Sequence, residues 1–272
     1  MMKPVSIPAY VWLAVNFKKY NLVKYLYFLL LTVLLFSCAE KKEIFETESI
    51  ADYVPLAIGK SITYRLDSTV FARSGTVIEV HKYQLKHTIT GETTDNNGRK
   101  TFIIQRHLNN ETASGSWAHN GTYFITPYDN KIEVLDNTMR VVTLQAPLKR
   151  DFTWKGNSQL PFAPYGPLFD MSTGYDMNTW SFVYSDFGNE TLEGQTYNNV
   201  WTVEQHNETM NIPPTPETRI GTKEVSVEKY AKGIGLVYKD FHLYEYQGAG
   251  GSGNTSAHYT GFGITMWIVG HN

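Results

Sequence analysis

The sequence predicts an all-β protein built on a single large, strongly curved antiparallel sheet, and three observations lead to this fold class. The chain beyond residue 37 is rich in tyrosine, phenylalanine, threonine, valine and glycine, a composition that favours pleated, half-buried strands over helices. It contains repeated short runs in which apolar and polar residues alternate, which is the period of a half-buried strand. It has no apolar stripe of helical period longer than about two turns. A β-sandwich is the alternative that these observations leave open.

The first strands follow from alternation and turn residues. Residues 62–67 alternate between apolar and polar side chains, and Gly59 supplies the turn before them. Residues 76–90 and 100–108 are extended runs joined by Asp-Asn-Asn-Gly at 95–98. An Asn-Gly pair between such runs predicts a hairpin, because both residues tolerate positive φ. Further runs lie at residues 117–126, 131–135, 140–145, 179–186, 199–207 and 222–230. We therefore expect one antiparallel domain over residues 53–272, with roughly ten strands.

The C-terminal part gives the clearest pattern. Gly233 and Gly235 are expected to turn the chain back into an antiparallel neighbour. In the strand that follows, Val237, Phe241 and Leu243 share one face and Lys239 is the exception. The last strand alternates strictly and is predicted to lie in the core and close the sheet. Its apolar residues on one face are Phe262, Ile264, Met266 and Ile268.

A long loop interrupts the strands at residues 155–178. It contains three prolines among its aromatic residues, so it is not a central strand. A long loop of this kind either covers the core or lines a functional site. If it lines a site, the candidate ligand-lining residues are Phe162, Tyr165, Phe169 and Trp180. Cover over the core is the preferred interpretation.

The N-terminal segment predicts export. Residues 25–36 form an apolar run that would span roughly 18 Å as a helix, which is short of a ~30 Å hydrocarbon core. Lysines precede it and no acidic residue lies upstream, as in an export signal over residues 1–37. A second apolar patch at residues 9–15 is not needed for a signal. We therefore expect that residues 1–21 are an extension and that translation starts near Leu22 or Val23.

The end of this signal resembles the lipobox of bacterial lipoproteins. The residues are Leu35, Phe36, Ser37 and Cys38, and Phe36 is a departure that lipoproteins of the Bacteroidota type tolerate. The resemblance implies cleavage between Ser37 and Cys38, lipid attachment at Cys38 and a lipidated tether over residues 38–52. An ordinary secretory signal with an unrelated cysteine, or a buried helix with a free thiol, is the alternative.

Composition restricts the chemistry of the mature protein. Residues 1–37 hold four lysines and no carboxylate, so their removal leaves 20 basic and 26 acidic side chains. An acidic surface without a basic stripe argues against nucleic acid as a partner. Cys38 is the single cysteine, and no metal-binding, nucleophile-elbow or dinucleotide motif accompanies it. We expect no cofactor, no metal and no catalytic residue.

Scattered motifs resemble a broad group of uncharacterised bacterial envelope lipoproteins. They comprise Pro55-Leu56 with Gly59 and Tyr64, Gly188-x-Glu190-Thr191 with Gly194 and Tyr197, and Tyr-Ala-x-Gly-Ile-Gly-Leu-Val at 230–237. That group is similar in shape to the lipoprotein carriers LolA and LolB. The resemblance implies a half-barrel of the LolA or lipocalin kind, anchored through its N-terminal lipid to a membrane of the cell envelope, most often the outer membrane, on its periplasmic or surface face.

Two functions fit these observations. The first is a non-catalytic binding or assembly lipoprotein for an apolar or lipid ligand, a glycan or an envelope protein. The second is a hydrolase acting on envelope or environmental polymers. A concave cavity favours the first, whereas a pair of carboxylates or a histidine and a carboxylate in a cleft favours the second.

Overall fold

The computed structural model describes residues 48–169, 171, 176–250 and 256–272. These residues belong to one compact unit, Thr47–Asn272. Ser37, Cys38 and the predicted signal lie outside the described residues. Within the part that is described, none of the helices has the length and apolar character needed to cross a membrane.

In the part of the chain that the structure describes, twelve strands make up almost all of the regular structure. In chain order they are β1 (Ser61–Phe71), β2 (Val77–Thr94), β3 (Lys100–Asn110), β4 (Ala118–Pro127), β5 (Lys131–Asp136), β6 (Met139–Gln145), β7 (Thr153–Trp154), β8 (Phe182–Leu192), β9 (Gln195–Met210), β10 (Ile220–Ala231), β11 (Gly235–Gln247) and β12 (His258–His271). The helices are short: η1 (Ile50–Tyr53), α2 (Ala72–Gly75), α3 (Gly166–Phe169) and η2 (Met177–Thr179).

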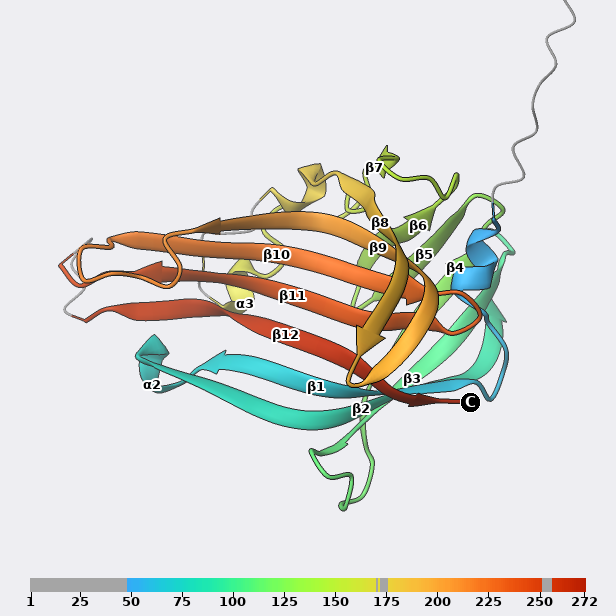
Figure 1. The fold of residues 1–272 in the computed structure, drawn as a ribbon, viewed down its shortest axis with the longest axis horizontal. Helices are drawn as coiled ribbons and strands as arrows, with labels where there is room; N and C mark the ends of the chain where they lie inside the picture. The colour runs from blue at the N-terminus through green and yellow to red at the C-terminus, as the bar shows by residue number, and fades with distance from the viewer. Residues whose placement is uncertain (1–47, 170, 172–175, 251–255) are drawn as a thin grey trace, which may run out of the picture. The chain divides into compact units, whose positions relative to one another are not determined.

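All twelve strands belong to one antiparallel sheet, in the order β6-β5-β4-β3-β2-β1-β12-β11-β10-β9-β8-β7. This confirms the predicted all-β class and the single, strongly curved sheet, which is nearly closed into a barrel, and it excludes the β-sandwich. Strands that are neighbours in the sheet are also consecutive in sequence, except at the centre, where β1 pairs with β12; the consecutive strands β6 and β7 are the two edges. Figure 1 shows β10, β11 and β12 side by side and followed by β1 and β2. The predicted count of roughly ten is too low, in part because the two-residue β7 carries no alternation to detect.

Local signals place the turns correctly. The predicted hairpin joins β2 to β3, and Gly98 takes a φ of 75° in its turn. Gly233 and Gly235 have φ values of 76° and 117° in the turn between β10 and β11. Both glycines therefore use the positive φ that other residues avoid.

The last strand lies between β1 and β11. Met266 is opposite Leu66 on β1 and opposite Lys239 on β11, so β12 is paired along both edges. Met266 and Ile268 are buried, as the alternation predicts. β12 therefore connects the N-terminal half of the sheet to its C-terminal half.

The two edges of the sheet, β6 and β7, approach each other at a seam. The Val142 N–H on β6 donates to the Gly156 carbonyl (2.9 Å), and Trp154 Nε1 on β7 donates to the Val142 carbonyl (2.8 Å). The hydroxyl of Tyr184 on β8 accepts from the Gln145 N–H (3.0 Å) and donates to the Gln145 carbonyl (2.9 Å). Side chains thus take part in three of these four hydrogen bonds across the seam.

The short helix η1 packs against the turn between β10 and β11. Ile50 and Tyr53 are buried in the main core, and the Gly233 N–H donates to the Asp52 carbonyl (2.7 Å). Ile50 is therefore packed into the domain, although it lies inside residues 38–52, which the sequence assigns to the tether.

Candidate ligand-binding cavity

A cavity of about 450 Å³ lies against the concave face of the sheet. Both halves of the sheet line it, since its wall includes Leu66 on β1, Val141 on β6, Phe241 on β11 and Ile264 on β12. Its volume lies within the ~300–1,000 Å³ typical of small-molecule sites. The apolar side chains face inward because alternate residues of a strand point to the same side of the sheet.

One polar cluster projects into this cavity from β10 and β11. Lys239 Nζ donates to Glu228 Oε1 (2.9 Å), and the Tyr230 hydroxyl donates to Glu228 Oε2 (2.6 Å). Burial alone would lower the pKa of Lys239, but the Glu228 carboxylate outweighs it and the pKa is raised. Lys239 therefore stays charged in an apolar wall, and Glu228 and Lys239 are directly opposite each other on neighbouring strands.

A second polar cluster comes from the N-terminal half. Arg106 on β3 and Asp136 on β5 form a bidentate pair, with Nη1 to Oδ2 at 2.7 Å and Nη2 to Oδ1 at 3.1 Å. The guanidinium group of Arg106 also lies over the Tyr123 ring, 5.5 Å from its centroid. This geometry uses the planar fork of arginine, which matches the two oxygens of a carboxylate.

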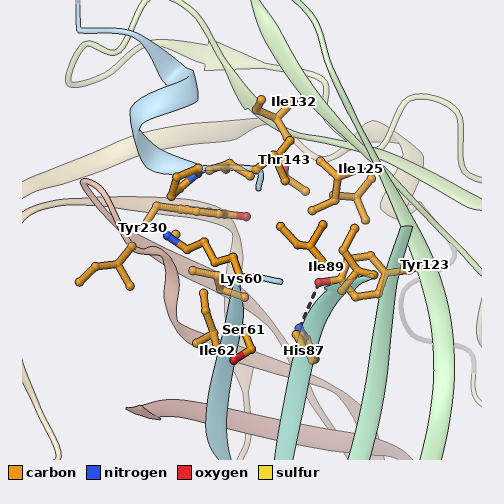
Figure 2. A pocket seen from close by; sticks show the side chains of 18 of the residues that line it. Lys60, Ser61, Ile62, His87, Ile89, Tyr123, Ile125, Ile132, Thr143 and Tyr230 are labelled. Carbon is orange, nitrogen blue, oxygen red and sulfur yellow. Dashed lines mark hydrogen bonds between the residues drawn. The ribbon is translucent and has the colours of Figure 1, made fainter. Parts of the chain in front are cut away.

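His87 on β2 completes this second cluster. Its Nδ1 lies 3.1 Å from the Tyr123 hydroxyl (Figure 2), and its ring packs edge-on against Tyr64 and Tyr123. Burial lowers the pKa of His87 to about 3, reinforced by the positive charges of Arg106 and Lys239. His87 is therefore neutral at physiological pH.

A smaller compartment of about 90 Å³ adjoins the cavity. The two share His87, Tyr123, Ile125 and Thr143 in their walls, so the bond between His87 and Tyr123 lies where they meet. Figure 2 shows Ile62, Ile89, Ile125 and Ile132 around the smaller compartment, with Lys60 at its side. The wall of this compartment is mainly apolar and includes Val54 and Leu56, which follow η1.

The four predicted ligand-lining residues lie in three different places. Tyr165 lines the cavity and packs against Phe241 and Phe262. Phe169 packs on Phe262 from the side, with ring centroids 4.6 Å apart, and is about one-third exposed. The structure thus brings Tyr165 and Phe169 together at Phe262.

Phe162 and Trp180, like Phe169, are not among the residues that line this cavity. Phe162 is 75% exposed, because the chain at that point runs over the surface. Trp180 is buried, and its ring stacks on His206 with centroids 4.4 Å apart. The loop therefore covers the core at some positions and is exposed at others.

Sequence reasoning missed most of the polar residues of the cavity. Arg106 and His87 share the apolar faces of their runs, Arg106 with Ile104 and His87 with Leu85, but the sequence analysis did not single them out. Asp136 lies just beyond the run at residues 131–135, and Glu228 has the position of a solvent-facing residue. Lys239 is the one that the pattern did mark, as the exception on an apolar face. That exception carried a usable signal: a charge on a buried face needs a partner, and the partner is Glu228.

The charged residues of the cavity decide whether its carboxylates could act as a catalytic acid and base. Among the described residues that line the cavity, five titratable side chains are present besides Tyr123 and Tyr165, and each carboxylate is held by a cation: Asp136 by Arg106 and Glu228 by Lys239. His87 pairs with a tyrosine instead of a carboxylate. A pair of carboxylates working as acid and base needs one that is free to exchange protons, and these two are committed to ion pairs.

Comparisons with known proteins give no family. No family model matches the chain, and no curated protein matches it. Solved structures of similar outline include a Bacteroides fragilis protein inferred to be exported, with a YMCC-like fold (TM-score 0.35, 9% identity, 79% of this chain and 96% of that chain covered). Another is an inferred lipoprotein from Parabacteroides distasonis (TM-score 0.34, 9% identity, 76% and 94% covered). A DUF1329 family protein from Desulfovibrio piger is more distant (TM-score 0.18, 10% identity, 82% and 92% covered).

Proposed function

We propose that this protein is a lipoprotein of the cell envelope that binds an apolar ligand inside its curved sheet and does not transform it. One observation carries the proposal: a cavity of about 450 Å³ whose wall is mainly apolar and is built from both halves of the sheet. A filled core would leave no such space, because protein interiors are close-packed. The loss of packing that the cavity represents is compensated when a ligand fills it.

The character of the wall favours an apolar ligand over a glycan. Leu66, Leu236, Ile264 and Met266 contribute to a wall whose surface is mostly apolar, whereas a sugar needs many hydrogen-bonding groups. The committed ion pairs favour binding over hydrolysis, which was the alternative. A hydrolase of envelope polymers would require a free acid or base beside the substrate.

Anchoring completes the proposal. Cys38 would carry the lipid after cleavage behind Ser37, with the outer membrane as the destination, and two or more acyl chains would hold the domain there permanently. Replacement of Cys38 by alanine is expected to leave the precursor uncleaved and unlabelled by an alkyne-tagged fatty acid, whereas Thr47→Ala is labelled like the wild type. A Cys38→Ala protein that is still labelled would contradict the anchoring.

A cavity-filling variant tests the binding. The chain from residue 39 onwards contains the whole compact unit and can be titrated with a neutral apolar dye that fluoresces when it is desolvated. We expect Ile264→Trp to weaken dye binding at least about tenfold, because the larger ring occupies the cavity. The control is Val269→Trp on the same strand, since Val269 is 45% exposed and its replacement leaves the cavity open.

Two results would contradict binding in the cavity. One is a wild-type protein that does not bind the dye. The other is equal dye affinity in Ile264→Trp and Val269→Trp, with circular dichroism showing both variants folded. Either result would place the function elsewhere on the molecule.

A further inference from the structure

A second hollow lies on the outer face of the sheet. It is a groove of about 530 Å³ beside the hairpin that joins β2 to β3. Phe124, Thr126 and Glu133 line this groove, whereas Tyr123 and Val134, their neighbours in sequence, line the concave cavity. Neighbouring residues of a strand point to opposite faces of the sheet. The groove and the cavity therefore lie on opposite sides of β4 and β5.

A buried carboxylate holds two cations in the wall of the groove. Carboxylates on the outer face of a sheet are usually hydrated, but Glu133 is only 3% exposed. Lys131 Nζ donates to Glu133 Oε2 (3.3 Å), and Arg140 Nη1 donates to Oε1. The Tyr128 hydroxyl also donates to Oε1 (3.4 Å). Because a buried charge needs such partners, Glu133 fixes Lys131 and Arg140 beside each other.

Arg99 adds a third cation to the same wall. Arg99 Cζ and Lys131 Nζ lie over the Tyr128 ring, 4.6 and 4.3 Å from its centroid. Arg99 Nε donates to Asp95 Oδ2 (2.7 Å), so these two residues neutralise each other. Lys131 and Arg140, in contrast, share the single carboxylate of Glu133. The charged residues among the described lining of the groove therefore sum to one positive charge.

The two cations that share Glu133 can still reach a ligand. The side chains of Lys131 and Arg140 are 26% and 36% exposed. An ammonium group has three hydrogens and a guanidinium group has five, and the bonds to Glu133 use one hydrogen of each. Both side chains therefore keep donors for an anionic group that enters the groove.

Neutral polar side chains make up much of the remaining wall. The exposed ones are Thr93, Thr94, Asn96, Asn97 and Gln159. Hydroxyl and amide groups both donate and accept hydrogen bonds, which matches the hydroxyls of a sugar. The volume of the groove also lies within the ~300–1,000 Å³ typical of small-molecule sites.

We propose that this groove binds a saccharide that carries an anionic group, either a carboxylate or a phosphate. The anionic group accepts from Lys131 and Arg140 in charge-assisted hydrogen bonds. The sugar hydroxyls bond to the threonine and amide side chains of the wall. Because the groove and the concave cavity lie on opposite faces, this site is independent of the apolar ligand proposed for the cavity.

Two pairs of probes test the site by isothermal titration calorimetry at pH 7.5. Digalacturonate is compared with its dimethyl ester, which has the same sugar rings without the negative charges. Glucose 6-phosphate is compared with inorganic phosphate, which has the anionic group without the sugar. In at least one pair we expect the anionic sugar to bind at least about tenfold more tightly than its partner. The pair that does so identifies the anionic group, and the proposal is overturned if neither does.

Substitutions locate the binding. Lys131→Gln leaves Arg140 on Glu133 and should weaken binding of the anionic sugar at least about fivefold, in line with the loss of one charge-assisted hydrogen bond. The matched control is Lys100→Gln, which removes the same charge from β3. Lys100 is 59% exposed and does not line the groove, so the affinity should stay unchanged.

A third variant tests the groove without touching the ion pairs. Thr94→Glu adds a negative charge at an exposed position of the wall and should also weaken binding of the anionic sugar. Circular dichroism checks the fold of each variant. Equal affinities in Lys131→Gln and Lys100→Gln, both folded, would overturn the proposal. If Lys131→Gln does not fold, an unchanged affinity in Thr94→Glu overturns it instead.

Discussion

Different interactions join the strands at the centre of the sheet, where β1 pairs with β12, and at the seam where its edge strands β6 and β7 approach each other. At the junction the first and last strands pair over eight positions, from Ile62 opposite His271 to Thr69 opposite Gly263. At the seam the hydrogen bonds come mainly from the side chains of Tyr184 and Trp154. β1 and β12 are therefore joined by a ladder of hydrogen bonds, whereas β6 is joined to β7 and β8 by aromatic side chains.

The difference has a physical origin in the strands themselves. β1 and β12 are 11 and 14 residues long, so both can pair over many positions. β7 has two residues, and the loop that follows carries three prolines that cannot donate to a ladder. The weaker seam lies next to the loop that supplies Tyr165 to the cavity. The comparison suggests that local opening occurs at the seam and that the junction stays intact.

The largest effect on the free energy of unfolding is expected from proline substitutions, one at the junction of β1 with β12 and one at the seam. Thr265 on β12 pairs with Asp67 on one side and Asp240 on the other, so Thr265→Pro removes a ladder bond from a strand that is paired on both edges. We expect a loss of more than about 3 kcal/mol in the free energy of unfolding, measured by urea denaturation. Val142→Pro at the seam removes only the bond to Gly156 and should cost about 1–2 kcal/mol. Equal losses would show that the seam is as strong as the junction.

A smaller effect is expected from removing one hydroxyl on each side of the comparison. Tyr184→Phe removes two hydrogen bonds to Gln145 across the seam and should cost about 1–3 kcal/mol. Tyr64→Phe removes one, to the Leu236 carbonyl, and should cost about 0.5–1.5 kcal/mol. Hydrogen exchange distinguishes the two, because Tyr184→Phe should speed exchange at the Gln145 amide and leave amides of β12 protected. Faster exchange along β12 in this variant would contradict a local seam.

The smallest effect is expected in the loop beside the seam. Phe162 is 75% exposed, so Phe162→Ser should change the free energy of unfolding by no more than about 0.5 kcal/mol. Tyr165→Ser should cost about 2–4 kcal/mol, because its ring packs against Phe241 and Phe262. Thermal unfolding measures both. A large loss in Phe162→Ser would mean that this ring, too, covers the core.

The sequence by itself determined the all-β class, the hairpin at residues 95–98 and the core position of β12. These features depend on local patterns, namely alternation with a period of two and turn residues that accept positive φ. The sequence also marked Lys239 as a charge on the apolar face of its strand. A local pattern reports which side of a strand a residue occupies, and that much could be predicted without the structure.

Only the tertiary structure decided which residues meet in the cavity. Arg106 reaches Asp136 across 30 positions of sequence, and His87 reaches Tyr123 across 36. These contacts depend on the register between strands and on the curvature that brings both halves of the sheet to one space. Alternation leaves both open, because shifting a strand by two residues preserves its apolar face and changes every partner.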